Sequence, residues 1–241
     1  TCGLAAGGQL RCWGSNDDGQ LDVPGDVADW SAVAAGGFQT CGLAAGGQLR
    51  CWGRNDDGQS NVPGDVAAWS AVAAGGTHTC GLAAGGQLRC WGRNDDGQSN
   101  VPGDVAAWSA AAAGGYHTCG LTAGWQLRCW GDNDDGQSNV PGDVAAWSAA
   151  AAGRWHTCGL TAGGQLRCWG RNDDGQSNVP GDVAAWSAAA AGRWHTCGLT
   201  AGGQLRCWGS NDDGQLDVPG DVADWSAVAA GGFQTCGLAA G

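Results

Sequence analysis

Residues 1–39 read TCGLAAGGQLRCWGSNDDGQLDVPGDVADWSAVAAGGFQ, and this string decides the fold because the chain repeats it from end to end. Such self-similarity is the mark of a repeat architecture. The sequence therefore predicts a single repeat array over residues 1–241. Its copies are 1–39, 40–78, 79–117, 118–156, 157–195 and 196–234, with a partial copy at 235–241.

Each copy predicts a small antiparallel β-sheet. Residues 1–4 and 9–13 have short strand patterns on either side of Ala-Ala-Gly-Gly, whose glycines suit a hairpin turn. Residues 30–36 are rich in alanine, but their short length and bounding glycines favour a strand over a helix. A sheet of three or four such strands cannot bury both faces alone. We therefore expect an all-β, β-propeller-like stack of 39-residue blades, as a closed ring or an open superhelical array.

Cysteines recur in pairs that are ten residues apart. Folding the first hairpin about Gly7 places Cys2 opposite Cys12, within reach of a disulfide. The predicted bridges are Cys2–Cys12, Cys41–Cys51, Cys80–Cys90, Cys119–Cys129, Cys158–Cys168 and Cys197–Cys207, and Cys236 is predicted to be unpaired. Regular bridges of this kind indicate an extracellular or cell-surface protein. The short Cys-x-x-Cys spacing typical of zinc sites is missing, so we expect no metal.

The composition disfavours several classes of function. The net charge is −12, and no basic stripe is present that could neutralise phosphates, so nucleic acid is not an expected partner. No apolar run reaches about 18 residues, so we expect no membrane insertion. No nucleophile with a partnered base and no phosphate-binding loop is recognisable, so we expect neither an enzyme nor a cofactor. The recurring pair Asp17-Asp18 is interpreted as part of an Asx-type turn.

The most informative variation precedes each Thr-Cys, where the triplet ranges from Gly37-Phe38-Gln39 to Arg193-Trp194-His195. Arginine beside tryptophan suits a protein or glycan contact, although packing of the rings between blades is the competing interpretation. The candidate binding residues are Tyr116, Trp125, Arg154, Trp155, His156, Arg193, Trp194 and His195. The first and sixth copies carry glutamine at the histidine position, so a structural hydrogen-bonding role is the alternative for the histidines.

The string HTCGLTAGGQLRCWGRNDDGQ, residues 156–176, resembles the blade motif of the regulator-of-chromosome-condensation family. The Val-Pro that follows resembles more closely the bacterial propellers that inhibit β-lactamases. What the resemblance implies is a propeller of four-stranded blades, usually seven, that acts through its faces as a protein-binding platform. No residue here matches the surface loops that carry exchange-factor activity.

Two non-enzymatic functions follow from these observations. The near-identity of the copies favours an extracellular structural element of a filament, sheath or surface appendage, acting through self-association. The alternative is a propeller that binds a protein or glycan, of the inhibitor or adhesin kind. The chain starts and stops inside a copy, so we expect it to continue or join another molecule past Gly241. The first and last sheets are then expected at opposite ends of an elongated particle.

Overall fold

The computed structural model describes residues 1–240, and all regular elements in that part of the chain are β-strands. Nineteen strands form seven antiparallel sheets. Five sheets have three strands each: β3 (Trp30–Ala35), β4 (Gln39–Ala44) and β5 (Leu49–Gly53); β6 (Trp69–Ala74), β7 (His78–Ala83) and β8 (Leu88–Gly92); β9 (Trp108–Ala113), β10 (His117–Thr122) and β11 (Leu127–Gly131); β12 (Trp147–Ala152), β13 (His156–Thr161) and β14 (Leu166–Gly170); β15 (Trp186–Ala191), β16 (His195–Thr200) and β17 (Leu205–Gly209). Two sheets have two strands each: β1 (Cys2–Leu4) with β2 (Leu10–Cys12), and β18 (Trp225–Ala230) with β19 (Thr235–Ala239). The predicted all-β fold is confirmed.

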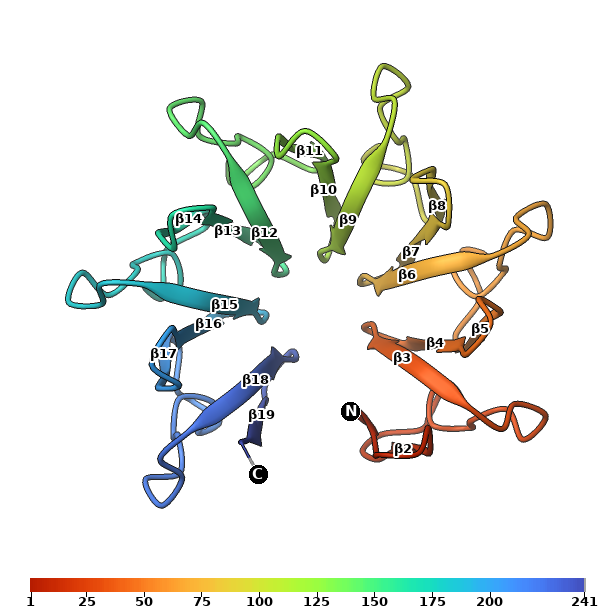
Figure 1. Cartoon of the computed structure of the whole chain (residues 1–241), viewed down its shortest axis with the longest axis horizontal. Coiled ribbons are helices and arrows are strands. Elements are labelled where there is room, and N and C mark those ends of the chain that lie inside the picture. The colour runs from red at the N-terminus through yellow and green to blue at the C-terminus, as the bar shows by residue number, and fades with distance from the viewer. Residues whose placement is uncertain (241) are drawn as a thin grey trace.

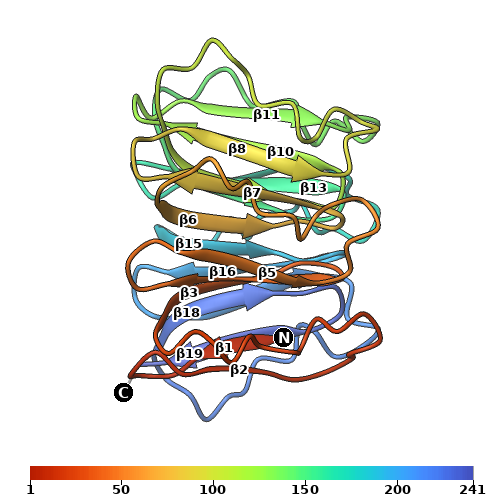
Figure 2. The same cartoon turned by 90° about the vertical axis from the view of Figure 1, so that its right-hand side faces the viewer.

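The sheets surround a central axis as the blades of a propeller (Figure 1), and the alanine-rich strands β3, β6, β9, β12, β15 and β18 converge on that axis. The first and last sheets lie next to one another, as a side view also shows (Figure 2). Gln234 Nε2 donates a hydrogen bond to Thr1 Oγ1 over 3.2 Å across this junction. The expectation of an elongated particle with distant end sheets is therefore wrong. A constant rotation from each blade to the next brings the array back on itself.

The number of positions in the ring follows from one repeated contact. The glutamine or histidine before each Thr-Cys bonds to the threonine 40 residues further on, as His195 Nε2 does to Thr235 Oγ1 over 2.9 Å. Gln234 makes the same kind of contact with Thr1. Thr1 thus occupies the place that the threonine of an eighth copy would have, and the ring has seven positions, one for each sheet.

The blade is offset from the sequence copy. Strand β3 ends the first copy, whereas β4 and β5, with which it forms a sheet, begin the second. The blades have three strands within the described residues, fewer than the four that the family resemblance implied. The stretch between β2 and β3 forms no fourth strand and is held by side-chain hydrogen bonds instead. The Leu21 amide, for example, donates to Asn16 Oδ1 over 2.7 Å. The Asn-Asp-Asp-Gly stretch is a turn closed by the backbone, because the Gly19 amide donates to the Asn16 carbonyl over 3.1 Å. The Asn16 side chain accepts five residues on, and not two residues on as in the Asx-type turn that the sequence predicted.

The core lies between adjacent blades and is built from cysteine, leucine and tryptophan. In one such cluster Cys41, Leu43 and Leu49 of one blade pack against Trp69 of the next. Gly81 lies directly against the Trp69 ring, where a methyl group would overlap the indole. The indole N–H of Trp91 donates to the Gln59 carbonyl over 3.0 Å. The recurring tryptophans of the complete blades therefore belong to the core between blades.

All six predicted disulfides are present, each within its own hairpin, and Cys236 is free. Because each bridge closes a short loop, chain entropy gives it about 2–3 kcal/mol of stability. We expect mass-spectrometric peptide mapping without reduction to link Cys41 to Cys51 and Cys80 to Cys90. We also expect reduction to lower the melting temperature markedly. Links between different copies would contradict this pairing.

Candidate functional site

A belt of short turns surrounds the axis, where each inner strand passes into the second strand of its blade (Figure 1). The first five of these turns are bonded in succession through the backbone. The Gly37 amide donates to the Gly75 carbonyl over 3.0 Å, and the Arg154 amide donates to the Gly192 carbonyl over 3.1 Å. A Cβ atom on Gly75 would lie 2.6 Å from the Gly114 carbonyl oxygen, so no larger residue fits there. The backbone of the belt is therefore constant from blade to blade.

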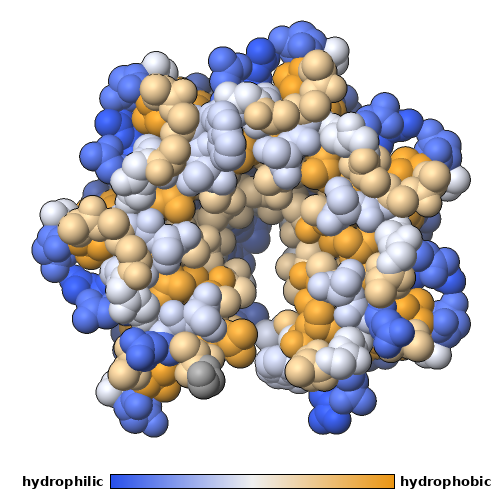
Figure 3. Space-filling model, in the orientation of Figure 1, coloured by the Kyte–Doolittle hydropathy of each residue, from blue (hydrophilic) through white to orange (hydrophobic). Residues whose placement is uncertain are grey.

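The residue that follows the glycines of each turn is the variable one. We call these six side chains the aromatic rim, although one of them is threonine: Phe38, Thr77, Tyr116, Trp155, Trp194 and Phe233. Phe38 and Phe233 are 41% and 49% exposed, and Tyr116, Trp155 and Trp194 are half-buried. The surface as a whole has hydrophilic residues at the outer periphery and more apolar ones nearer the central opening (Figure 3). The rim thus presents aromatic side chains to solvent on a fixed backbone.

Two arginines join the rim in the fourth and fifth copies. The Arg154 guanidinium lies 5.4 Å from the Tyr116 ring centroid and 5.1 Å from that of Trp155, and the two rings are 4.9 Å apart. The Arg193 guanidinium lies 5.3 Å from the Trp194 ring. Each cation–π contact of this kind contributes about 0.5–1 kcal/mol when exposed. The structure thus places five of the eight predicted site residues in one region.

The histidines predicted as candidates lie behind the rim. His156 and His195 are completely buried, and the His156 Nε2 atom lies 2.8 Å from Thr196 Oγ1. The Thr196 hydroxyl donates to the Gln176 carbonyl, so the histidine Nε2 must carry the proton and donate. Burial removes His156 and His195 from the candidate binding surface. They link one blade to the next, as the structural alternative predicted.

Burial also sets the charge of these histidines. Desolvation lowers the pKa of His78 and of His156 to about 4. The pKa of His117 falls to about 3, because burial is reinforced by repulsion from the neighbouring His78 and His156. Burial lowers the pKa of His195 as well. All four imidazoles are therefore neutral at pH 7.

Trp125 does not belong to the rim. It lies at the hairpin tip beyond Thr122, at the opposite end of β10 from Tyr116, and is 58% exposed. Its φ of 66° is left-handed, and it is the only residue other than glycine with a positive φ among those described. The other complete hairpins have glycine at this position, for example Gly47 and Gly164. The sequence placed Trp125 and the rim residues in one candidate set, and the structure separates them.

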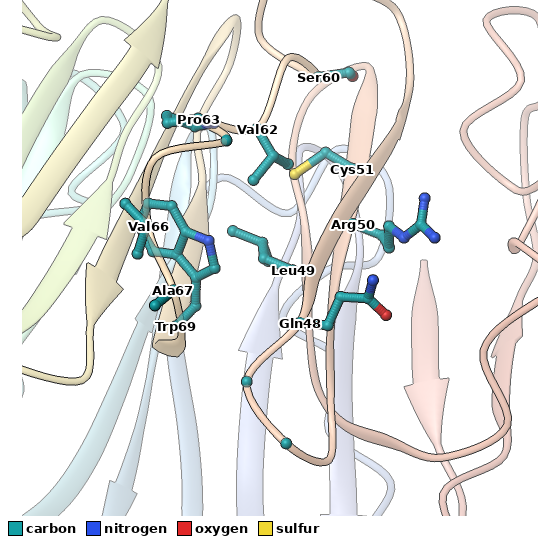
Figure 4. Close-up of a pocket in the computed structure, with 13 residues that line it drawn as sticks. Gln48, Leu49, Arg50, Cys51, Ser60, Val62, Pro63, Val66, Ala67 and Trp69 are labelled. Carbon is teal, nitrogen blue, oxygen red and sulfur yellow. The ribbon is translucent and has the colours of Figure 1, made fainter.

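The hairpin tip at Gly46 and Gly47 borders a groove between two neighbouring blades. In the second copy this groove has a volume of about 640 Å³, and its side chains Leu49, Val62 and Trp69 point toward one another (Figure 4). Gln48 and Arg50 point away from it. An equivalent groove of about 280 Å³ lies between residues 164 and 186. Because the residues that line it recur in most copies, the groove is a seam between neighbouring blades and does not distinguish one blade from another.

Trp125 offers a direct test of backbone strain. A residue with a side chain pays a steric penalty in the left-handed region that glycine does not pay. We expect Trp125→Gly to raise the free energy of unfolding by about 1 kcal/mol, measured by chemical denaturation. A loss of stability would show instead that the indole packs favourably enough to outweigh the strain.

Comparison with known proteins agrees with this architecture. A family model described as Regulator of chromosome condensation (RCC1) repeat matches residues 30–59, 69–98, 108–137, 147–176 and 186–215. The ectodomain of the receptor kinase CR4 of Physcomitrella patens is similar, with a TM-score of 0.82 and 29% identity over 99% of this chain and 66% of that one. Comparison with curated protein sequences finds no match.

Two further solved structures are similar along nearly the whole chain. The CRINKLY WD40 ectodomain of the Arabidopsis thaliana receptor kinase ACR4 has a TM-score of 0.79 and 26% identity, over 99% of this chain and 88% of that one. Yeast RCC1 (Prp20), solved bound to Kap60, has a TM-score of 0.81 and 18% identity, over 100% of this chain and 78% of that one. At 18% identity the yeast protein supports the fold alone. The chain spans slightly less than two thirds of the Physcomitrella ectodomain.

Proposed function

Because the chain belongs to the family of Regulator of chromosome condensation (RCC1) repeats, we propose that it is a non-enzymatic extracellular β-propeller that binds a partner protein through its aromatic rim. The observation that carries this proposal is the contrast between a constant framework and a variable rim. The same cysteines, leucines, tryptophans and glycines recur in every complete blade. The rim position, in contrast, ranges over Thr77, Phe38, Tyr116 and Trp155.

The extracellular assignment is supported by two independent features. Six bridges within a chain of this length need an oxidising compartment to form and persist. The two plant receptor structures with more than a quarter of their residues identical are ectodomains.

The composition of the rim supports binding over packing. Tryptophan, tyrosine and arginine dominate the residues that contribute most to protein interfaces. Here the aromatic rings are half-buried next to solvent, whereas the tryptophans that begin the inner strands of the complete blades, such as Trp147 at 2% exposure, are enclosed. The rim rings rest on a backbone belt that is bonded from blade to blade. Such a preorganised surface loses little entropy on association.

Selection of binders from a displayed peptide library tests the proposal. We expect the selected peptides to bind the double variant Trp155→Ala/Trp194→Ala at least 30-fold more weakly, since a hot-spot residue contributes about 2 kcal/mol or more. Trp125→Gly is the matched control, because it removes an exposed tryptophan at the other end of a blade and should retain binding. Peptides that bind the double variant as tightly as the original chain would contradict the proposal.

A structural role in a filament, sheath or appendage is the second candidate. It is supported by the near-identity of the six copies, which suits a repetitive building element. The hydrogen bond from Gln234 to Thr1 weighs against head-to-tail assembly, because it occupies the junction that successive segments would use. Sedimentation velocity over a range of concentrations distinguishes the two candidate functions. The sedimentation coefficient of a filament element should rise with concentration, whereas that of a binding propeller should stay at the monomer value.

A further inference from the structure

The distribution of positive charge in this acidic chain is uneven. Its only bases are 11 arginines, and eight of them form ion pairs with aspartates over 2.7–3.0 Å. The other three are Arg11, Arg154 and Arg193. Arg11 donates to the side chain of Gln9 on an exposed strand. The remaining two, which no carboxylate neutralises, both belong to the aromatic rim.

These two guanidinium groups are also incompletely hydrogen-bonded. Arg154 Nη2 donates to Tyr116 Oη over 3.1 Å, but its Nε is buried without an acceptor. The Nε of Arg193 and the indole Nε1 of Trp155 are likewise buried without an acceptor. Buried donors without a partner are costly, and native proteins satisfy nearly all of them. Arg50 and Arg89 also have a buried Nε without an acceptor, but each of them pairs with an aspartate. Arg154 and Arg193 are therefore distinguished by a positive charge that no carboxylate of the described residues neutralises.

The arginines also interact unfavourably with one another. Burial and the positive charge of Arg154 both lower the pKa of Arg193. The other copies avoid this cost, because the position of Arg154 is glycine in Gly37, Gly76 and Gly115. An anion beside the two guanidinium groups would offset their repulsion.

We propose that the rim at Arg154 and Arg193 receives one or two carboxylates of the partner protein, from Asp or Glu side chains that lie beside an aromatic residue. The proposal rests on the function proposed above and names the chemistry of the partner. Guanidinium groups bind carboxylates through paired, charge-assisted hydrogen bonds. The rings of Tyr116, Trp155 and Trp194 supply the apolar surface that an aromatic neighbour would cover.

The charge of the rest of the molecule favours a few carboxylates over a polyanion. The net charge is −12, and only two arginines of the rim lack an aspartate. A nucleic acid or sulfated polysaccharide would bring many negative charges against this surface. A single acidic side chain is neutralised locally and meets little of that repulsion, because salt screens exposed charges beyond about 8–10 Å.

A pair of defined peptides tests the proposal. The probe is Ac-Gly-Glu-Tyr-Glu-Gly-amide, its matched control carries glutamine for both glutamates, and calorimetry measures the affinity. We expect the glutamate peptide to bind at least 10-fold more tightly, and to lose at least 10-fold with Arg154→Gln/Arg193→Gln. Arg50→Gln/Arg206→Gln changes the net charge equally at ion-paired positions and should leave binding unchanged. Thermal melts of both variants check that they fold.

Several outcomes would overturn the proposal. Equal binding of the two peptides would do so, as would no measurable binding of either, or an equal loss in the Arg50→Gln/Arg206→Gln control. Displacement of the glutamate peptide by inorganic sulfate at a comparable concentration would show a general anion site instead. If library-selected peptides need Trp155 and Trp194 but not the two arginines, the carboxylate proposal fails and the proposed function stands. If the selected peptides need neither the two tryptophans nor the two arginines, the proposed function itself fails.

Discussion

Acidification from pH 7 to pH 5 should destabilise the ring by several kcal/mol. His78, His117 and His156 are neutral in the folded state, with pKa values of about 4, 3 and 4. In the unfolded chain their pKa is near 6.5. At pH 7 both states are neutral, so no stability is lost. Below pH 6.5 the unfolded chain takes up protons that the folded ring cannot, and stability falls until the pH reaches the folded values.

The size of this loss of stability depends on how far the pH lies below the unfolded-state pKa of each histidine and above its folded-state pKa. One pH unit within it corresponds to about 1.4 kcal/mol per histidine, so pH 5 removes about 2 kcal/mol for each of the three. Chemical denaturation at pH 7, 6 and 5 measures the loss.

The chain contains its own control for this prediction. Gln39 and Gln234 replace histidine in two copies, and each Oε1 accepts from the backbone amide before it, over 3.3 Å and 3.2 Å. The Gln39 Nε2 also donates to the His78 carbonyl over 3.1 Å. Replacing the four histidines with glutamine should therefore preserve folding at pH 7 and flatten the loss between pH 7 and pH 5. An unchanged loss in that variant would assign the acid sensitivity to other groups.

Trp147→Ala should cost about 3–5 kcal/mol in the free energy of unfolding, the second large effect. The Trp147 side chain is 2% exposed, packs with Cys119, Leu121 and Leu127 of the preceding blade, and lies 5.7 Å from the Trp169 ring. Alanine would leave a cavity between two blades that the disulfide-closed hairpins cannot fill. Denaturant titration at pH 7 measures the loss.

Trp155→Ala is the matched comparison for Trp147→Ala, since it removes the same side chain eight positions along the same stretch. Trp155 is half-buried and stacks on Tyr116, so its loss should cost only about 1 kcal/mol. Equal costs for the two variants would mean that the rim rings are core residues, which would undermine the proposed binding surface.

The hairpins could be predicted from the sequence because their determinants are local. Folding about Gly7 fixes which residues oppose one another, and the register Cys2–Cys12 and Leu4–Leu10 is the observed one. The strand Trp30–Ala35 was likewise predictable from its length and bounding glycines. Both inferences need only the alternation of side chains along a strand and the conformational freedom of glycine.

The relation between blades could not be predicted, because it depends on contacts between distant residues. The closure of the ring depends on how closely Gly75 approaches Gly114 and on the bond from Gln234 to Thr1. A repeat pattern is compatible with a ring or an open superhelix until that packing is known. The sequence pattern also did not separate Trp125 from Tyr116, although the six residues of β10 place them at opposite ends of one strand.

We expect the rim to bind a partner and the framework to determine folding, and a paired measurement on one variant separates the two roles. The dissociation constant of a selected partner and the free energy of unfolding are determined on the same samples of Trp155→Ala/Trp194→Ala. We predict that the dissociation constant rises at least 30-fold while unfolding changes by no more than about 2 kcal/mol, which leaves the ring folded at pH 7. An unchanged dissociation constant, or a loss of binding that occurs only because the ring unfolds, would contradict the account.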